Sequence, residues 1–339
     1  MRAVWITRHG GPEALEVRET ADPVPGPGQV RIRVSAAGLN FADVMAAQGL
    51  YPDAPKPPCV VGYEAAGVVD ALGEGRPGPA AGQRVLAMTH FGGQSDVVCV
   101  PAEQVLPIPD AMSFQAAAAL PVNYLTAYHM LFRVANVRPG ERVLVHMAAG
   151  GVGMAVLQLC RTVDNLVVFG TASAGKHDVL RAEGCTHPID YRATDYAAEV
   201  RRLTGGEGVD VVLDPLGGND WRKGLKLLRP LGRLVAFGFA NLASGPRRRP
   251  AHMASQVLGV PLLTPIQLMN QNRTVSGVNI GHLWGEIGAL REELEAVLAL
   301  WDQGAIKPHI DGSYPFTDAA SAHRRILRRQ NVGKVLLTP

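Results

Sequence analysis

A glycine-rich segment near the middle of the chain constrains the fold more than any other feature. It reads His146-Met-Ala-Ala-Gly-Gly-Val-Gly-Met154, between a strand-like apolar run at residues 142–146 and a helix-like run at 152–162. The three positions of a G-x-G-x-x-G pattern are held by Ala148, Gly150 and Gly153, with alanine in place of the first glycine. Such a pattern allows a tight turn, a close approach of the backbone to a pyrophosphate, and packing of the helix on the sheet. The segment predicts a dinucleotide site in which free N–H groups at the helix start bind phosphate.

From about residue 123 onward, strand-like and helix-like stretches alternate along the chain. Strands are expected at residues 142–146, 166–170, 188–191, 208–213, 233–239 and 273–280. Helices are expected at residues 152–162, 176–183, 196–203, 221–228 and 287–301. Several of these strands are apolar without alternation, which is typical of strands buried on both faces. Repeated βα units predict a doubly wound parallel sheet of the Rossmann type with right-handed crossovers.

The first part of the chain is rich in short strands and turns instead. Residues 30–35 alternate apolar and polar side chains, as expected of a half-buried strand. Further strands are expected at residues 65–71, 83–87 and 96–100, between glycine and proline turns. This spacing predicts a compact β-barrel-like domain formed by residues 1–122. A closing strand at 334–337 is expected to return to it, so that residues 306–339 complete this domain and residues 123–305 form the other.

The end of the second strand of the βα series bears on which dinucleotide is bound. An NAD site has an acidic residue roughly 20 residues beyond the turn, where it accepts a hydrogen bond from the ribose 2′-hydroxyl. Residues 169–176 contain no acid, and Ser173 and Lys176 are able to bond a 2′-phosphate instead. Tyr191 ends the third strand, where its hydroxyl is within reach in this topology. The alternative is that Lys176 is a solvated residue at a helix start, where a cation is mildly unfavourable.

Composition narrows the class of protein. The chain has 339 residues, of which 47% are hydrophobic and 19% charged, enough for two globular domains. Its four cysteines include no C-x-x-C pair, which excludes a disulfide framework and a local cysteine clip for a metal. A reduced, cytoplasmic protein is expected, because the N-terminal run is too short for a signal peptide. The apolar stretch 143–160 contains the glycine cluster, which is unlike a spanning helix.

Net charge is +3, from 33 basic and 30 acidic residues, which is too small to indicate nucleic acid. Residues 1–122 hold 8 basic and 12 acidic side chains, a net −4. Residues 123–339 hold the other 25 and 18, a net +7. A basic excess there suits an anionic ligand, although surface helices would explain it equally well.

Several segments together resemble the medium-chain dehydrogenase/reductase superfamily, and more narrowly its zinc-independent quinone oxidoreductase branch. They are AGLNFAD from Ala37, GLYP from Gly49, GYEAAGVV from Gly62, LPVNYLTA from Leu120 and AAGGVG from Ala148. Later segments, among them residues 170–177, 214–218, 303–311 and 331–337, are similar to the synaptic-vesicle amine-transport protein group of that branch. The resemblance covers essentially the whole chain. It implies a GroES-like β-rich catalytic domain joined to a Rossmann domain.

The resemblance also implies where NADPH and an acceptor bind. The implied cofactor residues are Asn40, Thr126, Ala149, Gly150, Gly151, Val152, Gly153, Thr171, Ser173, Lys176, Tyr191, Leu216, Phe237, Gly238, Phe239 and Asn331. Asn40 and Tyr51 are the implied catalytic residues, with Tyr51 a candidate proton donor; the alternative is that Tyr51 only positions a ligand or packs in its loop. A homodimer through the edge strand 273–280 is implied as well.

Alcohol dehydrogenases of this superfamily have a zinc-ligating cysteine where Asn40 stands and a histidine where Tyr63 stands. The region of their four-cysteine zinc lobe, residues 88–110, contains only Cys99. Zinc needs three or four N, S or O ligands, so no metal site is expected. Without this Lewis acid a conjugated acceptor is favoured, because the charge from hydride addition spreads to a distant oxygen. Positioning and hydrogen bonds then supply the remaining activation.

We therefore expect a zinc-independent, NADPH-dependent oxidoreductase that transfers hydride to a quinone or another conjugated carbonyl, with no nucleic-acid partner and no integral membrane segment. Two alternatives stay open. One is an NADPH-binding protein with little turnover, and the other is an enoyl-thioester reductase of a biosynthetic pathway. In the second case Arg247, Arg248 and Arg249 would contact the substrate, although a solvated loop is the simpler interpretation. The apolar segment 257–269 is expected to line the cleft or cover a dimer seam.

Overall fold

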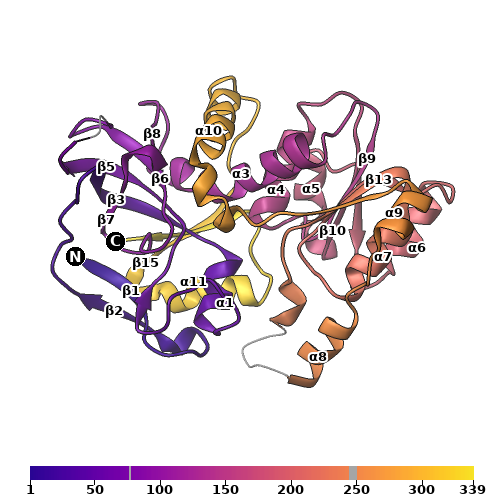
Figure 1. Cartoon of the computed structure of the whole chain (residues 1–339), viewed down its shortest axis with the longest axis horizontal. Coiled ribbons are helices and arrows are strands. Elements are labelled where there is room, and N and C mark those ends of the chain that lie inside the picture. Colours follow the sequence, from indigo (N-terminus) through magenta and orange to yellow (C-terminus); the bar gives the residue numbers. More distant parts are fainter. Residues whose placement is uncertain (76–77, 244–249) are drawn as a thin grey trace.

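The computed structural model describes residues 1–75, 78–243 and 250–339. Two main sheets lie side by side, and the chain passes from the first half to the second and back (Figure 1). The N- and C-termini both lie in the β-rich half. The structure is therefore a GroES-like half joined to a Rossmann half, as predicted.

The β-rich half contains a sheet with strand order β15-β16-β3-β5-β6-β8, in which β7 also pairs with β3. Its strands are β3 (Gln29–Leu39), β5 (Glu64–Leu72), β6 (Arg84–Met88), β7 (Val97–Pro101), β8 (Val105–Pro107), β15 (Ile310–Pro315) and β16 (Lys334–Thr338). A smaller sheet, β2-β1-β4, contains β1 (Arg2–Ile6), β2 (Leu15–Glu19) and β4 (Cys59–Val60). Along β3, Val30, Ile32 and Val34 are buried while Arg33 is exposed, which confirms the predicted alternation.

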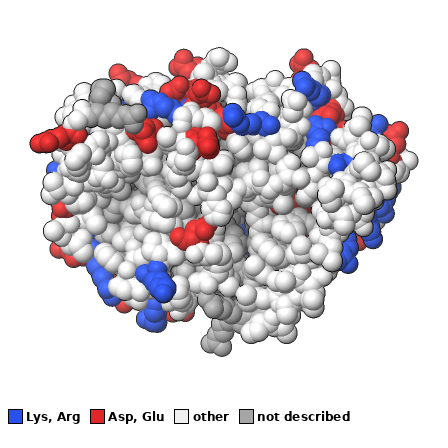
Figure 2. Space-filling view, viewed as in Figure 1, with Lys and Arg blue, Asp and Glu red and all other residues white. Residues whose placement is uncertain are grey.

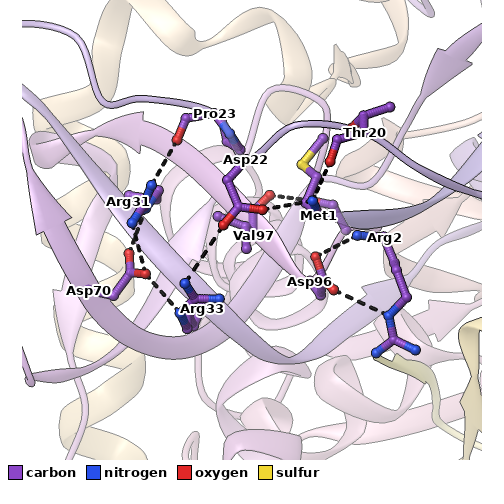
Figure 3. Close-up of polar contacts among 11 residues, drawn as sticks. Met1, Arg2, Thr20, Asp22, Pro23, Arg31, Arg33, Asp70, Asp96 and Val97 are labelled. Atoms are coloured by element: carbon purple, nitrogen blue, oxygen red, sulfur yellow. Dashed lines mark hydrogen bonds and ion pairs between the residues drawn. The ribbon is translucent and has the colours of Figure 1, made fainter.

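Charged side chains connect the strands of this half (Figure 3). Asp70 of β5 accepts hydrogen bonds from Arg31 at 2.8 Å and pairs with Arg33 at 2.9 Å. Asp22 pairs with Arg33 at 3.7 Å and with the amino group of Met1 at 2.7 Å. Exposed pairs of this kind contribute only ~0–1 kcal/mol each. Together they link the N-terminus, just before β1, to β3 and β5.

The second half is a parallel sheet with strand order β11-β10-β9-β12-β13-β14. Its strands are β9 (Arg142–Val145), β10 (Val167–Ala172), β11 (His187–Asp190), β12 (Val209–Asp214), β13 (Leu228–Ala236) and β14 (Thr274–Gly277). Numbered within this sheet, the order is 3-2-1-4-5-6, the arrangement of a dinucleotide-binding Rossmann sheet. Every predicted strand of the βα series is present, and all the pairings are parallel.

Helices bury both faces of this sheet, which explains the apolar strands. Val143 and Val145 of β9 pack in one core with α4, while Leu144 between them packs in another core with α6 and α7. The helices of this half are α3 (Pro121–Tyr128), α4 (Gly151–Cys160), α5 (His177–Ala182), α6 (Tyr196–Leu203), α7 (Asn219–Leu227), α8 (Pro250–Leu258), α9 (Pro265–Gln271) and α10 (Ile287–Asp302). The helices α1 (Phe41–Ala47), α2 (Phe114–Ala118) and α11 (Ala319–Leu327) belong to the other half.

Two expectations need correction. The last parallel strand is shorter than residues 273–280, because the side chain of Asn279 accepts a bond from the Gly281 N–H and begins a 3-10 turn at Ile280–His282. The segment 257–269 forms the end of α8, a loop and the first residues of α9, and no residue of these two helices is buried. None of its residues lines the cavity between the two halves, so it does not line the cleft, and its covering of a dimer seam stays a prediction. The three arginines at 247–249 lie outside the described residues. Where the structure describes the chain, it contains no helix with the length and apolarity to cross a membrane.

Candidate functional site

A cavity of about 1020 Å³ lies between the two halves. The carboxyl ends of β9 to β13 form one wall, and α1 with the loop that follows it forms the opposite wall. On the face shown in Figure 2, charged side chains lie mainly along the upper edge and the sides, and one acidic group lies near the middle. All the predicted site residues line the cavity: Asn40, Tyr51, Thr126, Ala149, Gly150, Gly151, Val152, Gly153, Thr171, Ser173, Lys176, Tyr191, Leu216, Phe237, Gly238, Phe239 and Asn331. The fold therefore brings these separate segments together at one site.

The glycine-rich turn fits closely between β9 and α4. A Cβ on Gly153 would lie 2.5 Å from the carbonyl oxygens of Met147 and Ala148, so only glycine fits without moving backbone. The α4 helix begins at Gly151, after the extended residue Gly150, and its first N–H groups have no side-chain cap. Uncapped N–H groups at the wall of a cavity are suited to bind phosphate oxygens.

The alanine at the first position of the pattern has a local explanation. Ala148 is completely buried, and its Cβ faces Gly170 of β10, where an added Cβ would lie 3.0 Å away. The extra methyl group of Ala148 thus occupies space that Gly170 leaves free. The same turn is held from the β-rich half, because the Gly333 N–H donates to the Ala149 carbonyl at 2.8 Å.

Cationic side chains gather at one end of the cavity. Lys176 is half-buried and its Nζ donates to the carbonyl oxygens of Arg329 at 2.8 Å and Asn331 at 2.7 Å. An ammonium group has three donors, so one remains for a ligand. Burial lowers the pKa of Lys176. Lys176 thus directly precedes α5 but is held by two backbone carbonyls beside the cavity, and its contact with a 2′-phosphate stays a prediction.

Two further cations at this end were missed in the sequence. Arg192 and Arg329 line the cavity beside Tyr191. Burial acts to raise the pKa of Tyr191, but hydrogen bonds with Arg329 and Arg192 outweigh it, and the net effect is a lowered pKa. Arg192 adjoins a predicted site residue in the sequence and could have been found from that position. Arg329 has no such local signal, because it reaches the site only through the return of β16.

A buried polar network holds Asn40 at the other end. The Asn40 Nδ2 donates to Glu64 at 2.8 Å, and its Oδ1 accepts from the Lys334 Nζ at 2.7 Å. Lys334 also pairs directly with Glu64, and both side chains are almost completely buried. Glu64 accepts a second bond, at 2.7 Å, from the backbone N–H of Val122. The amide of Asn40 is thus fixed in orientation, with one N–H free to face the cavity, and neither Glu64 nor Lys334 was predicted.

Tyr51 lies in the loop that follows α1. Its ring meets the Tyr63 ring edge-on, with centroids 6.1 Å apart, and its hydroxyl is close to the position that a Cβ on Gly281 would take, at 3.5 Å. Burial and the charge of Asp53 raise the pKa of Tyr51, so its hydroxyl is protonated at neutral pH and can donate. The wall around it is mainly apolar, with Phe41, Met45, Leu50, Pro52, Leu242 and Val278.

The two loops after β12 and β13 complete the site. Asp214 is buried at the end of β12, and one of its oxygens accepts from the N–H groups of Leu216 and Gly217, which shapes the first loop. His146 bonds Thr171 through Nδ1 at 3.1 Å and meets the Tyr196 ring edge-on. Burial lowers the pKa of His146, consistent with a structural role next to the turn.

Metal-ligating side chains do not gather at this site. In residues 1–75, 78–243 and 250–339, no group of three or more His, Cys, Asp or Glu side chains is arranged to hold a metal ion. Asn40 and Tyr63, where the resemblance predicts zinc ligands in alcohol dehydrogenases, are engaged in other contacts: Asn40 donates to Glu64 and the Tyr63 ring meets Tyr51.

A GroES-like half, a Rossmann half and a phosphate turn in the cavity between them define a medium-chain dehydrogenase/reductase. Two family models agree: "Alcohol dehydrogenase GroES-like domain" matches residues 26–110, and "Zinc-binding dehydrogenase" matches residues 183–337. The chain belongs to this superfamily and within it to the family of the synaptic vesicle membrane protein VAT-1 homologues. It is 50% identical to the VAT-1 homolog of Rattus norvegicus over its whole length and 84% of that protein.

Two solved structures are also similar over nearly the whole chain. The Escherichia coli quinone oxidoreductase complexed with NADPH has a TM-score of 0.88 and 30% identity, with 100% of both chains covered. The CurK enoyl reductase has a TM-score of 0.85 and 30% identity, with 99% of this chain and 98% of the other covered. The predicted resemblance to the quinone oxidoreductase branch and the vesicle-protein group is confirmed.

Proposed function

We propose that this protein is an NADPH-dependent reductase of conjugated carbonyl compounds, such as quinones and enones, that acts without zinc. The observation that carries the proposal is that one cavity has a cationic end, with Lys176, Arg192 and Arg329, and a second end with a mainly apolar wall around Tyr51. We call the second the uncharged end, because the charge of Lys334 there is paired with Glu64. The cationic end is suited to a 2′-phosphate, and the uncharged end is suited to an apolar acceptor.

At the cationic end, Ser173, Lys176 and Tyr191 would bond the 2′-phosphate together with Arg192 and Arg329. No acidic side chain lies between Phe169 and Lys176 to repel it. The pyrophosphate would bind the N–H groups of residues 150–153 at the start of α4. NADPH, when bound, supplies the hydride. The loops with Leu216, Phe237, Gly238 and Phe239, together with Thr126 and Asn331, would hold the remainder of the cofactor.

At the uncharged end, hydride addition to a conjugated carbonyl places negative charge on the acceptor oxygen. The free N–H of Asn40 and the hydroxyl of Tyr51 are the donors available there to stabilise that charge. The apolar wall excludes water and holds the acceptor against the cofactor, which supports a near-attack geometry. Zinc-independence is supported by the amide at position 40 and the phenol at position 63, since neither is a usual zinc ligand.

The test begins with binding and continues to turnover. Fluorescence titration should show NADPH binding at least about tenfold tighter than NADH, as expected for the loss of one charge-assisted interaction. NADPH oxidation is then followed with a benzoquinone, an enone, an enoyl thioester and a saturated ketone, with metal chelator added. Quinone and enone should be reduced, and the ketone should not.

Other results would redirect the proposal. Equal affinity for NADH would contradict the assignment of the cationic end. Tight NADPH binding without oxidation by any acceptor would favour the second candidate, a cofactor-binding protein with little turnover. Reduction of the thioester alone would favour the enoyl-reductase alternative, to which the likeness to CurK gives some support.

We further propose a homodimer formed through the outer edge of the parallel sheet. The edge strand β14 pairs only with β13 in the part of the chain that the structure describes. Exposed apolar side chains gather in the segment before it, namely Val257, Leu258, Leu262, Leu263, Ile266 and Met269. An open edge beside an apolar surface is a feature that monomeric proteins usually avoid.

A further inference from the structure

We propose that Asp43, Tyr63 and Tyr51 form a proton relay from a buried carboxyl group to the uncharged end of the cavity. The inference rests on the proposed reductase function, because Tyr51 needs a new proton only if it gives one up during turnover. It assigns a role to two side chains, Asp43 and Tyr63, that cofactor and acceptor binding leave unexplained.

Asp43 lies in the first turn of α1 and is completely buried. Its Oδ2 accepts a 2.8 Å bond from the Asn40 N–H, and its Oδ1 has no hydrogen-bond partner. Burial raises the pKa of Asp43 to about 7, against the opposing effects of the backbone N–H groups of Asn40 and Gly62 and the charge of Lys334. The Gly62 N–H lies near the carboxyl group but forms no hydrogen bond of normal geometry with it. The negative charge of Glu64 raises the pKa of Asp43 further. Glu64 is itself paired with Lys334, whose positive charge acts in the opposite direction. The carboxyl group therefore carries a proton in a large share of molecules at neutral pH.

In the proposed relay, Tyr63 stands between this carboxyl group and Tyr51, whose ring it contacts. It directly precedes β5, its side chain is buried, and its hydroxyl also has no hydrogen-bond partner. The charge of Asp43 acts on both Tyr63 and Tyr51. The two tyrosine hydroxyls are close enough for each to shift the pKa of the other, although no hydrogen bond of normal geometry joins them in this structure.

The two unpartnered atoms support a relay on energetic grounds. A buried polar atom without a partner costs about 1–3 kcal/mol, so Asp43 Oδ1 and the Tyr63 hydroxyl together are a substantial penalty. A chain in which Asp43 Oδ1–H donates to Tyr63, and Tyr63 donates to Tyr51, would satisfy both atoms. The same chain leaves the Tyr51 proton directed to the cavity.

In each turnover one proton passes along the relay from Asp43 through Tyr63 and Tyr51 to the acceptor. After hydride has reached the acceptor, the Tyr51 O–H bond breaks and its proton forms a new bond to the reduced acceptor. Tyr63 gives its proton to Tyr51 and takes the proton of Asp43, which is left as a carboxylate. Burial raises the pKa of Tyr63, which disfavours its phenolate, so both transfers at Tyr63 occur together. After product leaves, water in the cavity returns one proton to Asp43 along the same path.

The experiment compares Tyr63→Phe and Asp43→Asn with wild type. Asparagine keeps an acceptor for the Asn40 N–H, and phenylalanine keeps the ring contacts of Tyr63, so both variants should fold. Tyr124→Phe is the matched control, because it removes another buried hydroxyl, one that bonds Gln158 at 2.7 Å away from the relay. Infrared titration of the cofactor-free proteins measures the protonated-carboxyl band, and steady-state assays measure the pH profile of kcat and its solvent isotope effect.

A relay predicts a carboxyl band that titrates near pH 7 in wild type, disappears in Asp43→Asn and changes frequency in Tyr63→Phe. Both variants should lose about tenfold or more in kcat above neutral pH, with an increased solvent isotope effect and unchanged NADPH affinity. Absence of the band, or a Tyr63→Phe pH profile equal to wild type in an active enzyme, overturns the relay alone. If wild type reduces no acceptor, the proposed function fails and the relay fails with it.

Discussion

Arg329 is the residue whose role depends most on the three-dimensional fold. It follows α11 with a φ of 54°, in the left-handed region that non-glycine residues rarely adopt. Its carbonyl accepts from Lys176 and its side chain lies beside Tyr191, so it connects the end of the β-rich half to the cationic end of the cavity.

Replacing Arg329 with alanine should weaken NADPH binding by roughly 10- to 100-fold, since a hydrogen bond to a charged group contributes about 1.5–3 kcal/mol. NADH binding should change little, because NADH has no 2′-phosphate. Fluorescence titration with both cofactors measures the ratio. Arg328→Ala is the matched control, as Arg328 is an exposed neighbour that does not line the cavity. An equal loss for both cofactors would show that Arg329 supports the fold rather than the phosphate.

Some residues of the site were predictable from the sequence around them, whereas others reach the site only through contacts between distant segments. Gly150 and Gly153 were predicted from a local pattern, because a phosphate turn is made by consecutive residues. To predict Ser173, Lys176 and Tyr191 as site residues, only the expected order of the strands was needed, because they follow the second and third strands of the series. Glu64, Arg329 and Lys334 were missed because they meet the site through contacts between segments far apart in sequence, which periodicity and spacing do not encode.

At the scale of elements, the start of α4 leaves no room for an added side chain. A Cβ on Gly151 would lie 2.1 Å from the Asn123 side-chain nitrogen, whereas a Cβ on Gly153 would meet backbone oxygens. Gly151→Ala should therefore weaken NADPH binding and be partly rescued by Asn123→Ala. Gly153→Ala should lower both NADPH affinity and stability by about 1–3 kcal/mol, with no such rescue. Titration and thermal unfolding measure the two effects.

Gly288 offers the control for this prediction. It lies in α10, and apart from its chain neighbours and the helix backbone no atom lies within 4 Å of the position that an added Cβ would take. Gly288→Ala should therefore raise stability slightly, because alanine has a higher helix propensity than glycine. Rescue of Gly153→Ala by Asn123→Ala would contradict the distinction between a side-chain clash and a backbone clash.

Helices and strands were predictable from the sequence where their apolar residues follow one clear pattern. The strands β9 to β12 appear within a residue or two of their predicted positions, because burial on both faces produces continuous apolar runs, whereas β13 begins five residues earlier than predicted and β14 ends three residues earlier. The helix α1 was not predicted: it has seven residues, and five of them are buried, so it shows no polar face. The segment 257–269 was ambiguous for the opposite reason, since its apolar side chains lie on the surface.

At the scale of the whole molecule, that exposed apolar surface leads to the last prediction. Leu262 is 93% exposed and Met269 is 68% exposed, beside the open edge of β14. Burying such side chains against a second copy would gain about 1.5–3 kcal/mol for each large one. Wild-type protein should therefore sediment at twice the 36.0 kDa of one chain, and Leu262→Asp with Met269→Asp should shift it toward the monomer.

The control is Val24→Asp, because Val24 is 83% exposed in the β-rich half and far from this edge in the chain. It should leave the dimer intact. Every predicted cofactor residue lines this one cavity of a single chain, so the monomeric variant should still bind NADPH. A wild-type protein that sediments as a single chain would contradict the dimer. Loss of NADPH binding on dissociation would instead show that the edge contact stabilises the Rossmann half as a whole.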